Sequence, residues 1–263
     1  MTLRINLNSD LGESFGAWSM GDDEAMLAVV ASVNIACGFH AGDPLVMTRT
    51  VKAALQRGVE IGAHPSYPDL QGFGRRAMAL SSAEIEAITA YQIGALAGIA
   101  RAAGGQLSHV KPHGALNNLA AVDEAVALAI GRAIKGVDPA LVFLAPSGSA
   151  MVAAGRQLGV PVIEEVFADR NYDDDGNLLT RSHPQAVIHD EKEVVARVLR
   201  MVREDSLVSV TGKKLPCRAQ SVCVHGDTPG AVALASGLRQ ALDQAGVTVV
   251  GLRELVTNAA YPA

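Results

Sequence analysis

Four histidines occupy equivalent positions in four separate segments of the sequence. Each segment is an apolar run of the kind found in buried strands, and each run stops at a titratable residue before glycine or proline turns the chain. The histidines at these stops are His40, His64, His113 and His225. If the four strands are parallel neighbours, their carboxyl ends share one face, so we expect the histidines to converge there.

The pair Lys111 and His113 carries the clearest chemical information among these segments. Residues two apart in an extended chain point to the same side, which puts the ammonium beside the imidazole. A cation next to a titratable base favours acid–base catalysis and substrate binding. A metal site built from Asp10, His40 and His64 is the alternative that the same residues allow, and the sequence leaves it open.

Acidic side chains also follow the predicted strands. Asp10 and Glu13 come after the first apolar run, residues 4–8, in a stretch that contains two glycines. Either this stretch surrounds a ligand, or Asp10 and Ser14 only cap turns, and the residue types support both interpretations equally. Asp43 precedes Pro44, and a carboxylate followed by proline is a typical start of a helix.

Two later loops add further candidates. Residues 64–76 are rich in proline, glycine, aromatic residues and arginine, including Arg75, and such loops bind a ligand or close over one. The predicted strand 161–166 leads into Asp169 and Arg170. The polar stretch that follows has the spacing of an EF-hand calcium loop, but Ser182 stands where that loop requires glutamate, so we exclude a calcium site of this type.

The hydrophobic pattern predicts a β/α barrel. Strand-like and helix-like segments alternate about seven or eight times, and the polar residues gather where strands end. The predicted elements include a helix over residues 22–30 and a last long helix that begins at Thr228 and Pro229. With 263 residues, of which 49% are hydrophobic, the chain is long enough for one such barrel, and we predict a single domain over residues 1–263.

Composition excludes several classes of partner. The net charge is −5, aromatic residues make up 4% of the chain, and no block of lysine and arginine occurs, which argues against a nucleic-acid or anionic-membrane surface. The three cysteines form no C-x-x-C pair, and we expect them to be reduced packing residues. The chain opens directly on a strand pattern and has no uninterrupted apolar span, so we expect a cytoplasmic protein.

The common nucleotide and hydrolase motifs are absent from the sequence. Gly212-Lys213 is followed by Lys214, and Leu207 stands where a phosphate-binding P-loop needs its first glycine. The chain contains no G-x-G-x-x-G fingerprint, no G-x-S-x-G elbow and no H-E-x-x-H zinc motif. Any use of a nucleotide therefore involves an unfamiliar site or a partner protein.

Several short motifs, taken together and in order, resemble the LamB/YcsF family over nearly the whole chain. Two positions depart from the usual family pattern, Ser9 and Asn118. The matching motifs are Asn8-Ser9-Asp10-Leu11-Gly12-Glu13, Asn34 through Asp43-Pro44, Gly62-Ala63-His64-Pro65-Ser66, Gly72-Phe73-Gly74-Arg75, Lys111-Pro112-His113-Gly114, Glu165 through Arg170 and His225-Gly226-Asp227.

This resemblance implies a fold and an activity. The fold would be an irregular β/α barrel similar to polysaccharide deacetylases. The activity would be that of the A subunit of an ATP-dependent 5-oxoprolinase, which opens the lactam of 5-oxo-L-proline to L-glutamate while ATP becomes ADP and phosphate. The resemblance also implies the partner subunits B and C, ATP with Mg²⁺ as co-substrate, and a cytoplasmic enzyme.

The resemblance assigns roles to the candidate residues. Lys111 and Arg170 would stabilise the developing negative charge, while His64 or His113 with Asp10 would handle water and protons. The predicted catalytic residues are Asp10, His40, His64, Lys111, His113, Asp169 and Arg170, and the predicted substrate-binding residues are Glu13, Asp43, Arg75 and His225.

Two rival functions stay open from the sequence. One is a metal-dependent deacetylase or amidohydrolase that works alone. The other is a non-catalytic subunit that binds a small carboxylated ligand and passes it on. A requirement for metal would favour the first, and loss of binding without a separate loss of turnover on substitution of Lys111 and His113 would favour the second.

Overall fold

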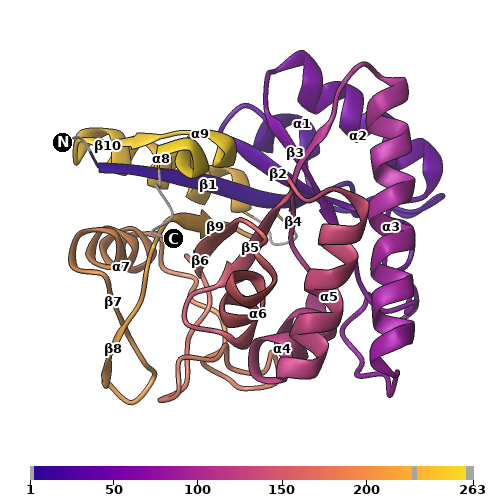
Figure 1. Cartoon of the computed structure of the whole chain (residues 1–263). Coiled ribbons are helices and arrows are strands. Elements are labelled where there is room, and N and C mark those ends of the chain that lie inside the picture. The colour runs from indigo at the N-terminus through magenta and orange to yellow at the C-terminus, as the bar shows by residue number, and fades with distance from the viewer. Residues whose placement is uncertain (1–2, 227–229, 259–263) are drawn as a thin grey trace.

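Seven parallel strands form a closed barrel, and an eighth strand extends it. The computed structural model describes residues 3–226 and 230–258. The strand order is β10-β1-β2-β3-β4-β5-β6-β9, and β9 pairs back with β1 to close the ring (Figure 1). This architecture confirms the predicted β/α barrel. The strands are β1 (Leu3–Leu11), β2 (Ser32–Ala36), β3 (Glu60–His64), β4 (Leu107–Val110), β5 (Val142–Pro146), β6 (Val162–Phe167), β9 (Ser221–Cys223) and β10 (Val247–Val249).

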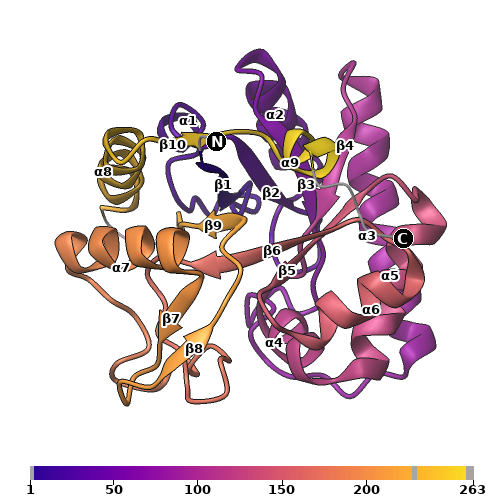
Figure 2. The same cartoon turned by 60° about the vertical axis from the view of Figure 1, so that its left-hand side comes forward.

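Helices surround the barrel, as the alternating pattern predicts (Figures 1 and 2). The long helix α3 begins with a capping box. The side chain of Ser81 accepts a hydrogen bond from the backbone amide of Glu84, and the side chain of Glu84 accepts one from the backbone amide of Ser81. The helices are α1 (Asp23–Met26), α2 (Pro44–Gln56), α3 (Ser82–Ala102), α4 (Gly114–Val122), α5 (Glu124–Val137), α6 (Ala150–Leu158), α7 (Glu191–Glu204), α8 (Ala231–Gln244) and α9 (Leu252–Asn258).

Strand β1 shows why the interior of the barrel is polar. Side chains alternate between the two faces of a strand. Ile5 and Leu7 are buried in the hydrophobic core, whereas the intervening Asn6, Asn8 and Asp10 bond to side chains of other barrel strands. Asp10 pairs with β2 and is thus part of the strand, two residues beyond the predicted end. Along β1, the barrel interior therefore contains the amides of Asn6 and Asn8 and then, toward the carboxyl end of the strand, the carboxylate of Asp10.

The lower interior is a connected set of buried polar groups that we call the amide network. Oδ1 of Asn6 accepts hydrogen bonds of 2.9 Å from the hydroxyls of Ser32 and Ser221. Higher up, the amide of Asn34 donates to Oδ1 of Asn8 at 2.8 Å. None of the buried side-chain polar atoms in this set lacks a hydrogen-bond partner. The amide network consists of Asn6, Asn8, Ser32, Asn34, His109 and Ser221.

His109 fills a space that a glycine leaves open. A Cβ atom on Gly62 of β3 would lie 2.1 Å from Nε2 of His109, so no other residue fits at this position without displacing the ring. Nε2 of His109 donates to Oδ1 of Asn34 at 2.7 Å, and Nδ1 accepts from the hydroxyl of Ser108 at 2.7 Å. The ring is fully buried and neutral, because burial above all, then the charge of Lys111, lowers the pKa of His109 to about 3.

Helix α9 covers the amino ends of several strands. Leu252 packs against Val142 and Ile163, and Arg253 donates to the backbone carbonyl of Leu107 at the start of β4. The amino end of the barrel is therefore covered here by hydrophobic packing. The side chains available for chemistry lie at the opposite, carboxyl end.

The structure differs from the sequence-based expectations at a few elements. Helix α1 is shorter than the predicted 22–30 helix, because the chain after Met26 continues in tight turns, with the amide of Ala28 bonded three residues back. A two-stranded antiparallel hairpin, β7 (Ser206–Val208) and β8 (Lys214–Pro216), was not predicted and stands away from the barrel below α7 in Figure 2. The predicted helix start at Thr228 and Pro229, and Asp227, lie outside the described residues.

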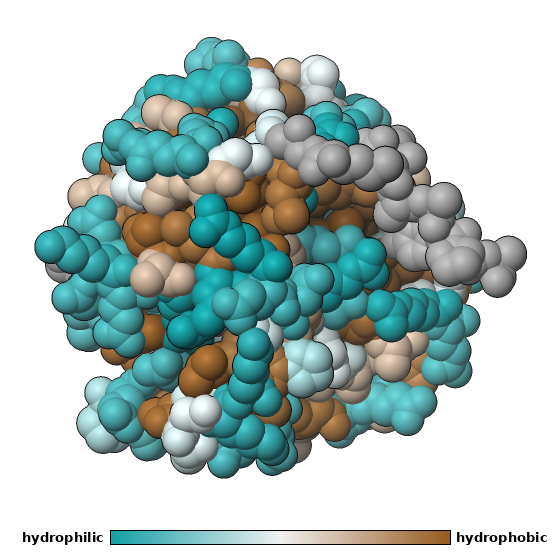
Figure 3. Space-filling model, turned by 90° about the vertical axis from the view of Figure 1, so that its left-hand side faces the viewer, coloured by the Kyte–Doolittle hydropathy of each residue, from teal (hydrophilic) through white to brown (hydrophobic). Residues whose placement is uncertain are grey.

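The helices of the described residues pack around the barrel, and none of them has the length and hydrophobicity needed to cross a membrane. Figure 3 shows one face of the molecule, on which hydrophilic side chains are spread widely and hydrophobic ones lie between them toward the middle of the view.

Candidate active site

A cavity of about 460 Å³ opens at the carboxyl ends of the barrel strands. This volume is in the usual range for sites that bind small molecules. The cavity wall combines acids, imidazoles, one lysine and three arginines. Its charged and titratable lining residues are Asp10, Glu13, His64, Arg75, Lys111, His113, Arg170, Arg181 and His225.

Lys111 is the central charged group of the cavity floor. Its Nζ atom lies 3.1 Å from Oδ1 of Asp10 and 3.2 Å from Oε2 of Glu165. It also lies 3.0 Å from Sγ of Cys223. The Lys111 side chain is only 3% exposed, so two carboxylates surround an almost fully buried ammonium. The close packing of opposite charges holds all three side chains in fixed positions.

Charge interactions outweigh burial at Asp10 and at Lys111. Burial favours the neutral form of each group, but the charges of His64 and Lys111 hold the pKa of Asp10 well below its ordinary value. The charges of Asp10, Cys223 and Glu165 likewise hold the pKa of Lys111 above its ordinary value, against burial. Burial raises the pKa of Glu165, and the charge of Lys111 only partly offsets this. Asp10 and Lys111 are therefore an ion pair at neutral pH.

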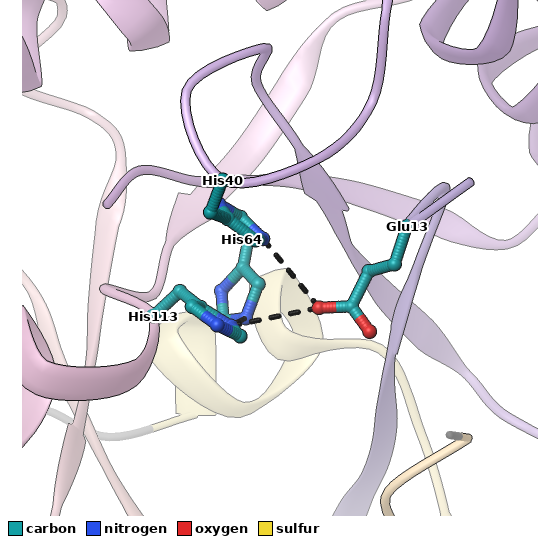
Figure 4. Close-up of side chains that lie close together, drawn as sticks. All are labelled: Glu13, His40, His64 and His113. Carbon is teal, nitrogen blue, oxygen red and sulfur yellow. Dashed lines mark hydrogen bonds and ion pairs between the residues drawn. The ribbon is translucent and has the colours of Figure 1, made fainter. Parts of the chain in front are cut away.

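Three of the four strand-end histidines meet beside this ion pair. We call them, with Glu13, the histidine cluster: Glu13, His40, His64 and His113. The ring of His40 stacks on His113 with centroids 3.9 Å apart, and both lie edge-on to His64. Figure 4 shows the three rings and the Glu13 carboxylate turned toward one another from separate segments. The predicted convergence therefore holds for His40, His64 and His113.

Hydrogen bonds to backbone carbonyls orient two of these rings. Nδ1 of His64 donates to the carbonyl of Lys111 at 2.6 Å, and Nε2 of His113 donates to the carbonyl of Phe73 at 2.9 Å. Phe73 belongs to the long loop after β3, which passes close to the histidines because Gly74 has a φ of +63° and no side chain. Burial, and then the neighbouring imidazoles, lower the pKa of His40 and His113 well below the ordinary value.

The fourth histidine lies on another part of the same cavity wall. Nδ1 of His225 is 2.9 Å from Oδ1 of Asp169, and its ring stacks on Phe167 with centroids 5.7 Å apart. Burial opposes ionisation of Asp169, but the charge of His225 and its hydrogen bond outweigh it and lower the pKa of Asp169. His225 therefore forms an acid–imidazole pair of its own and does not join the histidine cluster.

The predicted arginines reach the cavity in different ways. Arg170 is buried, and its guanidinium donates to the carbonyls of Ala186 and Leu179. Burial, and then the charge of Arg181, lower the pKa of Arg170 to about 10. Arg75 is exposed at the cavity wall, where its guanidinium lies 4.8 Å from the centroid of the Phe73 ring.

Asp43 lies apart from the cavity, although it is one of the predicted substrate-binding residues. Its Oδ1 accepts from the amides of Leu45 and Val46, and its Oδ2 accepts from the amide of Gly16 at 2.8 Å. It is the N-cap of α2, and it does not line the cavity. The helix-start motif before Pro44 fully accounts for this carboxylate.

Two residues of the site are not among the candidates that the sequence indicates. Glu165 is predicted only as an acid within a strand, and Cys223 only as a packing residue, yet both lie within 3.2 Å of Nζ of Lys111. Glu165 could have been found from the sequence, because Glu164 and Glu165 are adjacent acids in an otherwise apolar strand. Side chains alternate between the faces of a strand, so one of the two must point into the barrel. Asn8 holds Glu165 in place through a 2.7 Å hydrogen bond.

Two groups of side chains offer metal-ligating atoms within 4.8 Å of one another among the described residues. The first is the histidine cluster. The second is Asp10, Cys223 and His225. The predicted ligand set Asp10, His40 and His64 does not match either group, although Oδ2 of Asp10 lies 3.4 Å from Nε2 of His64.

A model of the LamB/YcsF family matches residues 5–257 of this chain. The chain belongs to the LamB/YcsF family. Among its curated relatives, the A subunit of 5-oxoprolinase from Azoarcus sp. is 56% identical over 253 residues, which cover 96% of this chain and 99% of the relative. The family resemblance carried by the short motifs is thus confirmed over nearly the whole length.

Solved structures agree with this family and with the barrel. The lactam utilization protein of Thermus thermophilus has a TM-score of 0.89 and 43% identity, with 95% of this chain and 100% of that chain covered. A deacetylase solved with its substrate has a TM-score of 0.51 at 15% identity and covers 97% of this chain and 92% of that chain. The second likeness concerns the fold alone.

Proposed function

We propose that this chain is the A subunit of an ATP-hydrolysing 5-oxoprolinase, which cleaves 5-oxo-L-proline to L-glutamate. The observation that carries the proposal is the buried Lys111 ammonium between two carboxylates on the floor of a small-molecule cavity. The family supports it, because relatives covering nearly the whole chain are named as the A subunit of 5-oxoprolinase and a similar structure is a lactam utilization protein.

The cavity suits a small anionic lactam. A planar guanidinium matches the geometry of a carboxylate, and Arg170 and Arg75 bring two such groups to the cavity wall. We assign the carboxylate of 5-oxoproline to these arginines. The lactam carbonyl then faces the floor, where Lys111 and the histidine cluster lie, while His225, which is paired with Asp169, borders the same space.

Ring opening requires one bond to form and one to break. Water adds to the lactam carbonyl carbon, the carbon–nitrogen bond breaks, and the nitrogen takes up a proton to become the amine of glutamate. Lys111 stabilises the negative charge that develops on the carbonyl oxygen. Asp10, which is ionised, accepts a proton from the attacking water and returns it to the nitrogen, and His64, whose Nε2 is 3.4 Å from Oδ2 of Asp10, holds that carboxylate in position.

A five-membered lactam is more stable than the open chain, so ring opening alone is unfavourable. Coupling to ATP hydrolysis makes it favourable. We propose that the amide oxygen attacks the γ-phosphorus of ATP and releases ADP, with Mg²⁺ bound to the nucleotide, and that this activates the carbonyl carbon for the addition of water. Cleavage of the carbon–nitrogen bond then leaves an acyl phosphate, which a second water hydrolyses to glutamate and phosphate. The sequence has no P-loop. We therefore assign nucleotide binding to partner subunits B and C, and the complex to the cytoplasm, where three free buried cysteines stay reduced.

Glutamate formation from 5-oxoproline and ATP tests the proposal. The chain alone, the partner subunits B and C alone and the mixture are compared at equal concentrations. We expect glutamate only in the mixture. Glutamate in none of the three samples, although the proteins are folded and associate, would contradict the assignment.

A variant separates catalysis from mere assembly. His113→Ala should abolish glutamate formation in the mixture while the three proteins still co-elute in gel filtration. His189→Ala, which removes an exposed histidine, is the matched control and should keep full activity. If His113→Ala binds 5-oxoproline less tightly but turns it over at the normal rate, the chain binds the substrate without catalysing its cleavage.

A further inference from the structure

The histidine cluster contains two ring nitrogens that face each other at hydrogen-bonding distance. Nδ1 of His113 lies 3.0 Å from Nε2 of His64. The opposite nitrogen of each ring donates to a backbone carbonyl, which leaves the two facing nitrogens as the available ligand atoms of these rings. Either one proton shared between these two nitrogens or a metal ion bound to both makes their contact favourable.

His40 supplies a second, independent observation. The ring is 1% exposed, and among the described residues neither of its nitrogens has a hydrogen-bond partner. A buried polar atom without a partner costs about 1–3 kcal/mol, so such atoms are rare unless they serve a ligand. Nε2 of His40 lies 3.5 Å from Oε1 of Glu13, and Nδ1 of His113 lies at the same distance from this oxygen (Figure 4).

From these contacts we propose that Glu13, His40, His64 and His113 bind a divalent first-row transition-metal ion of the zinc type. The ligand atoms are Nε2 of His40, Nε2 of His64, Nδ1 of His113 and Oε1 of Glu13. Three imidazoles and one carboxylate are a ligand set that zinc and its neighbours prefer over calcium or magnesium, which bind through oxygen.

The spacing of the ligand atoms fits a tetrahedral ion. Bonds of about 2.0–2.1 Å place tetrahedral ligands about 3.4 Å apart. Nδ1 of His113 and Nε2 of His40 each lie 3.5 Å from Oε1 of Glu13, and the contact between His64 and His113 is 3.0 Å. All four side chains offer ligand atoms within 4.8 Å of one another, so an ion at the centre draws the more distant atoms inward.

The surroundings of the cluster are also those of a metal site. Histidine ligands almost always donate their other ring nitrogen to a carbonyl or carboxylate, which fixes the tautomer. The carbonyls of Lys111 and Phe73 do this for His64 and His113. Glu13, His64 and His113 line the cavity, so the ion is next to the space that a small ligand occupies.

The second group of possible ligands is a poor site for a cation. Asp10 and Cys223 both lie within 3.1 Å of Nζ of Lys111, which already supplies a positive charge there. A divalent ion bound to these atoms would meet the ammonium at close range and be repelled. We therefore expect the histidine cluster to bind the ion and the second group not to bind it. A measurement of metal binding tests this difference independently of the proposed function.

The experiment measures metal content and affinity, not activity. The chain is stripped with a chelator, dialysed, and titrated with Zn²⁺ by calorimetry, and bound metal is then counted by mass spectrometry. We expect one ion per chain. His40→Gln and Glu13→Gln should each weaken binding by at least about 100-fold, since loss of a group that only orients a ligand already costs about 10–100-fold.

His225→Gln is the matched control, because it removes a histidine of the other group and should leave the stoichiometry and affinity unchanged. Glu13→Gln retains the shape of the side chain, and serves if His40→Gln does not fold. Co²⁺ in place of Zn²⁺ adds a spectroscopic readout: we expect the visible absorption of a tetrahedral ion, altered by Glu13→Gln.

Two results would overturn the proposal. One is no uptake of Zn²⁺ or Co²⁺ by the folded wild-type chain, in which case a proton shared by His64 and His113 occupies the gap. The other is loss of the ion in His225→Gln together with its retention in His40→Gln and Glu13→Gln, which would locate the ion at the second group.

Discussion

His109 and His113 stand four residues apart in the chain, and both are buried, but His109 lies inside the barrel and His113 lines the cavity at its carboxyl end, and their hydrogen bonding differs. In the amide network around His109 every buried side-chain polar atom has a partner, and both ring nitrogens of His109 are hydrogen-bonded. In the histidine cluster around His113, by contrast, neither ring nitrogen of His40 has a hydrogen-bond partner among the described residues.

This difference separates a group that supports the fold from one that serves a ligand. A complete hydrogen-bond network stabilises a single arrangement of the strands, whereas incomplete bonding costs stability and persists where a function requires it. Substitutions in the amide network should therefore change stability more than activity. Substitutions around the histidine cluster should do the reverse.

The largest effect on both stability and activity is expected at Lys111, because its ammonium contacts Asn8 of the amide network as well as the carboxylates of the cavity floor. Lys111→Met leaves Asp10 and Glu165 buried without their cation, which should lower the free energy of unfolding by about 3–5 kcal/mol. Glutamate formation in the mixture with subunits B and C should fall by about 10²–10³-fold or more, because one stabilising charge is lost. Urea unfolding and the glutamate assay measure the two effects.

Lys135→Met is the control for Lys111→Met, since Lys135 is exposed and only donates to the carbonyl of Leu158. It should change neither quantity measurably. Equal activity of Lys111→Met and Lys135→Met would remove Lys111 from the mechanism.

Asn6→Ala tests the amide network directly. It deletes three hydrogen bonds and leaves the hydroxyls of Ser32 and Ser221 with fewer acceptors, so the free energy of unfolding should fall by about 2–4 kcal/mol. Glutamate formed per folded complex should stay within about twofold of the wild type, which is well under about 1 kcal/mol of activation free energy.

Glu13→Gln is the counterpart in the histidine cluster. It keeps the shape of the side chain and one acceptor oxygen next to His40 and His113, so in the metal-free chain we expect the free energy of unfolding to change by no more than about 1 kcal/mol. Activity in the mixture should fall strongly. If instead Glu13→Gln unfolds easily and retains its turnover, the contrast between the two regions is wrong.

His109→Gln changes the dependence of stability on pH. The pKa of His109 is about 3 in the folded chain and about 6.5 when unfolded, so between these values the unfolded chain binds one more proton. Stability therefore falls as pH decreases through this window, by up to about 1.4 kcal/mol per pH unit from this residue. In urea unfolding between pH 4 and 6 (roughly the centre of the window), the slope for His109→Gln should be shallower by about this amount. Identical slopes would mean that the folded chain protonates His109.

The smallest effect is expected outside both regions. Arg132 and Glu86 form a 2.7 Å ion pair between α5 and α3, and their side chains are 42% and 40% exposed. Arg132→Gln should change the free energy of unfolding by no more than about 0.5 kcal/mol and leave activity unchanged. A larger loss would show that helix contacts on the outside control the barrel as strongly as its interior does.

The barrel could be predicted from the sequence because short stretches of residues mark where its strands and helices begin and end. Apolar runs that end in glycine or proline mark the strands, and caps such as Asp43-Pro44 and Ser81 through Glu84 mark the helices. The β7–β8 hairpin lacked such a pattern, since its strands have three residues each. The topological position of the histidines could likewise be predicted, because the ends of parallel strands share one face.

The sequence by itself determined which side chains stand at the carboxyl ends of the strands, because that position follows from the local pattern of each segment. Only the tertiary structure decided that His40, His64 and His113 meet while His225 pairs with Asp169. It also decided that Glu165 and Cys223 contact Lys111. The reason is physical: strand ends follow from local patterns, but the closure of the barrel and the carbonyls that orient each ring depend on residues far apart in the chain.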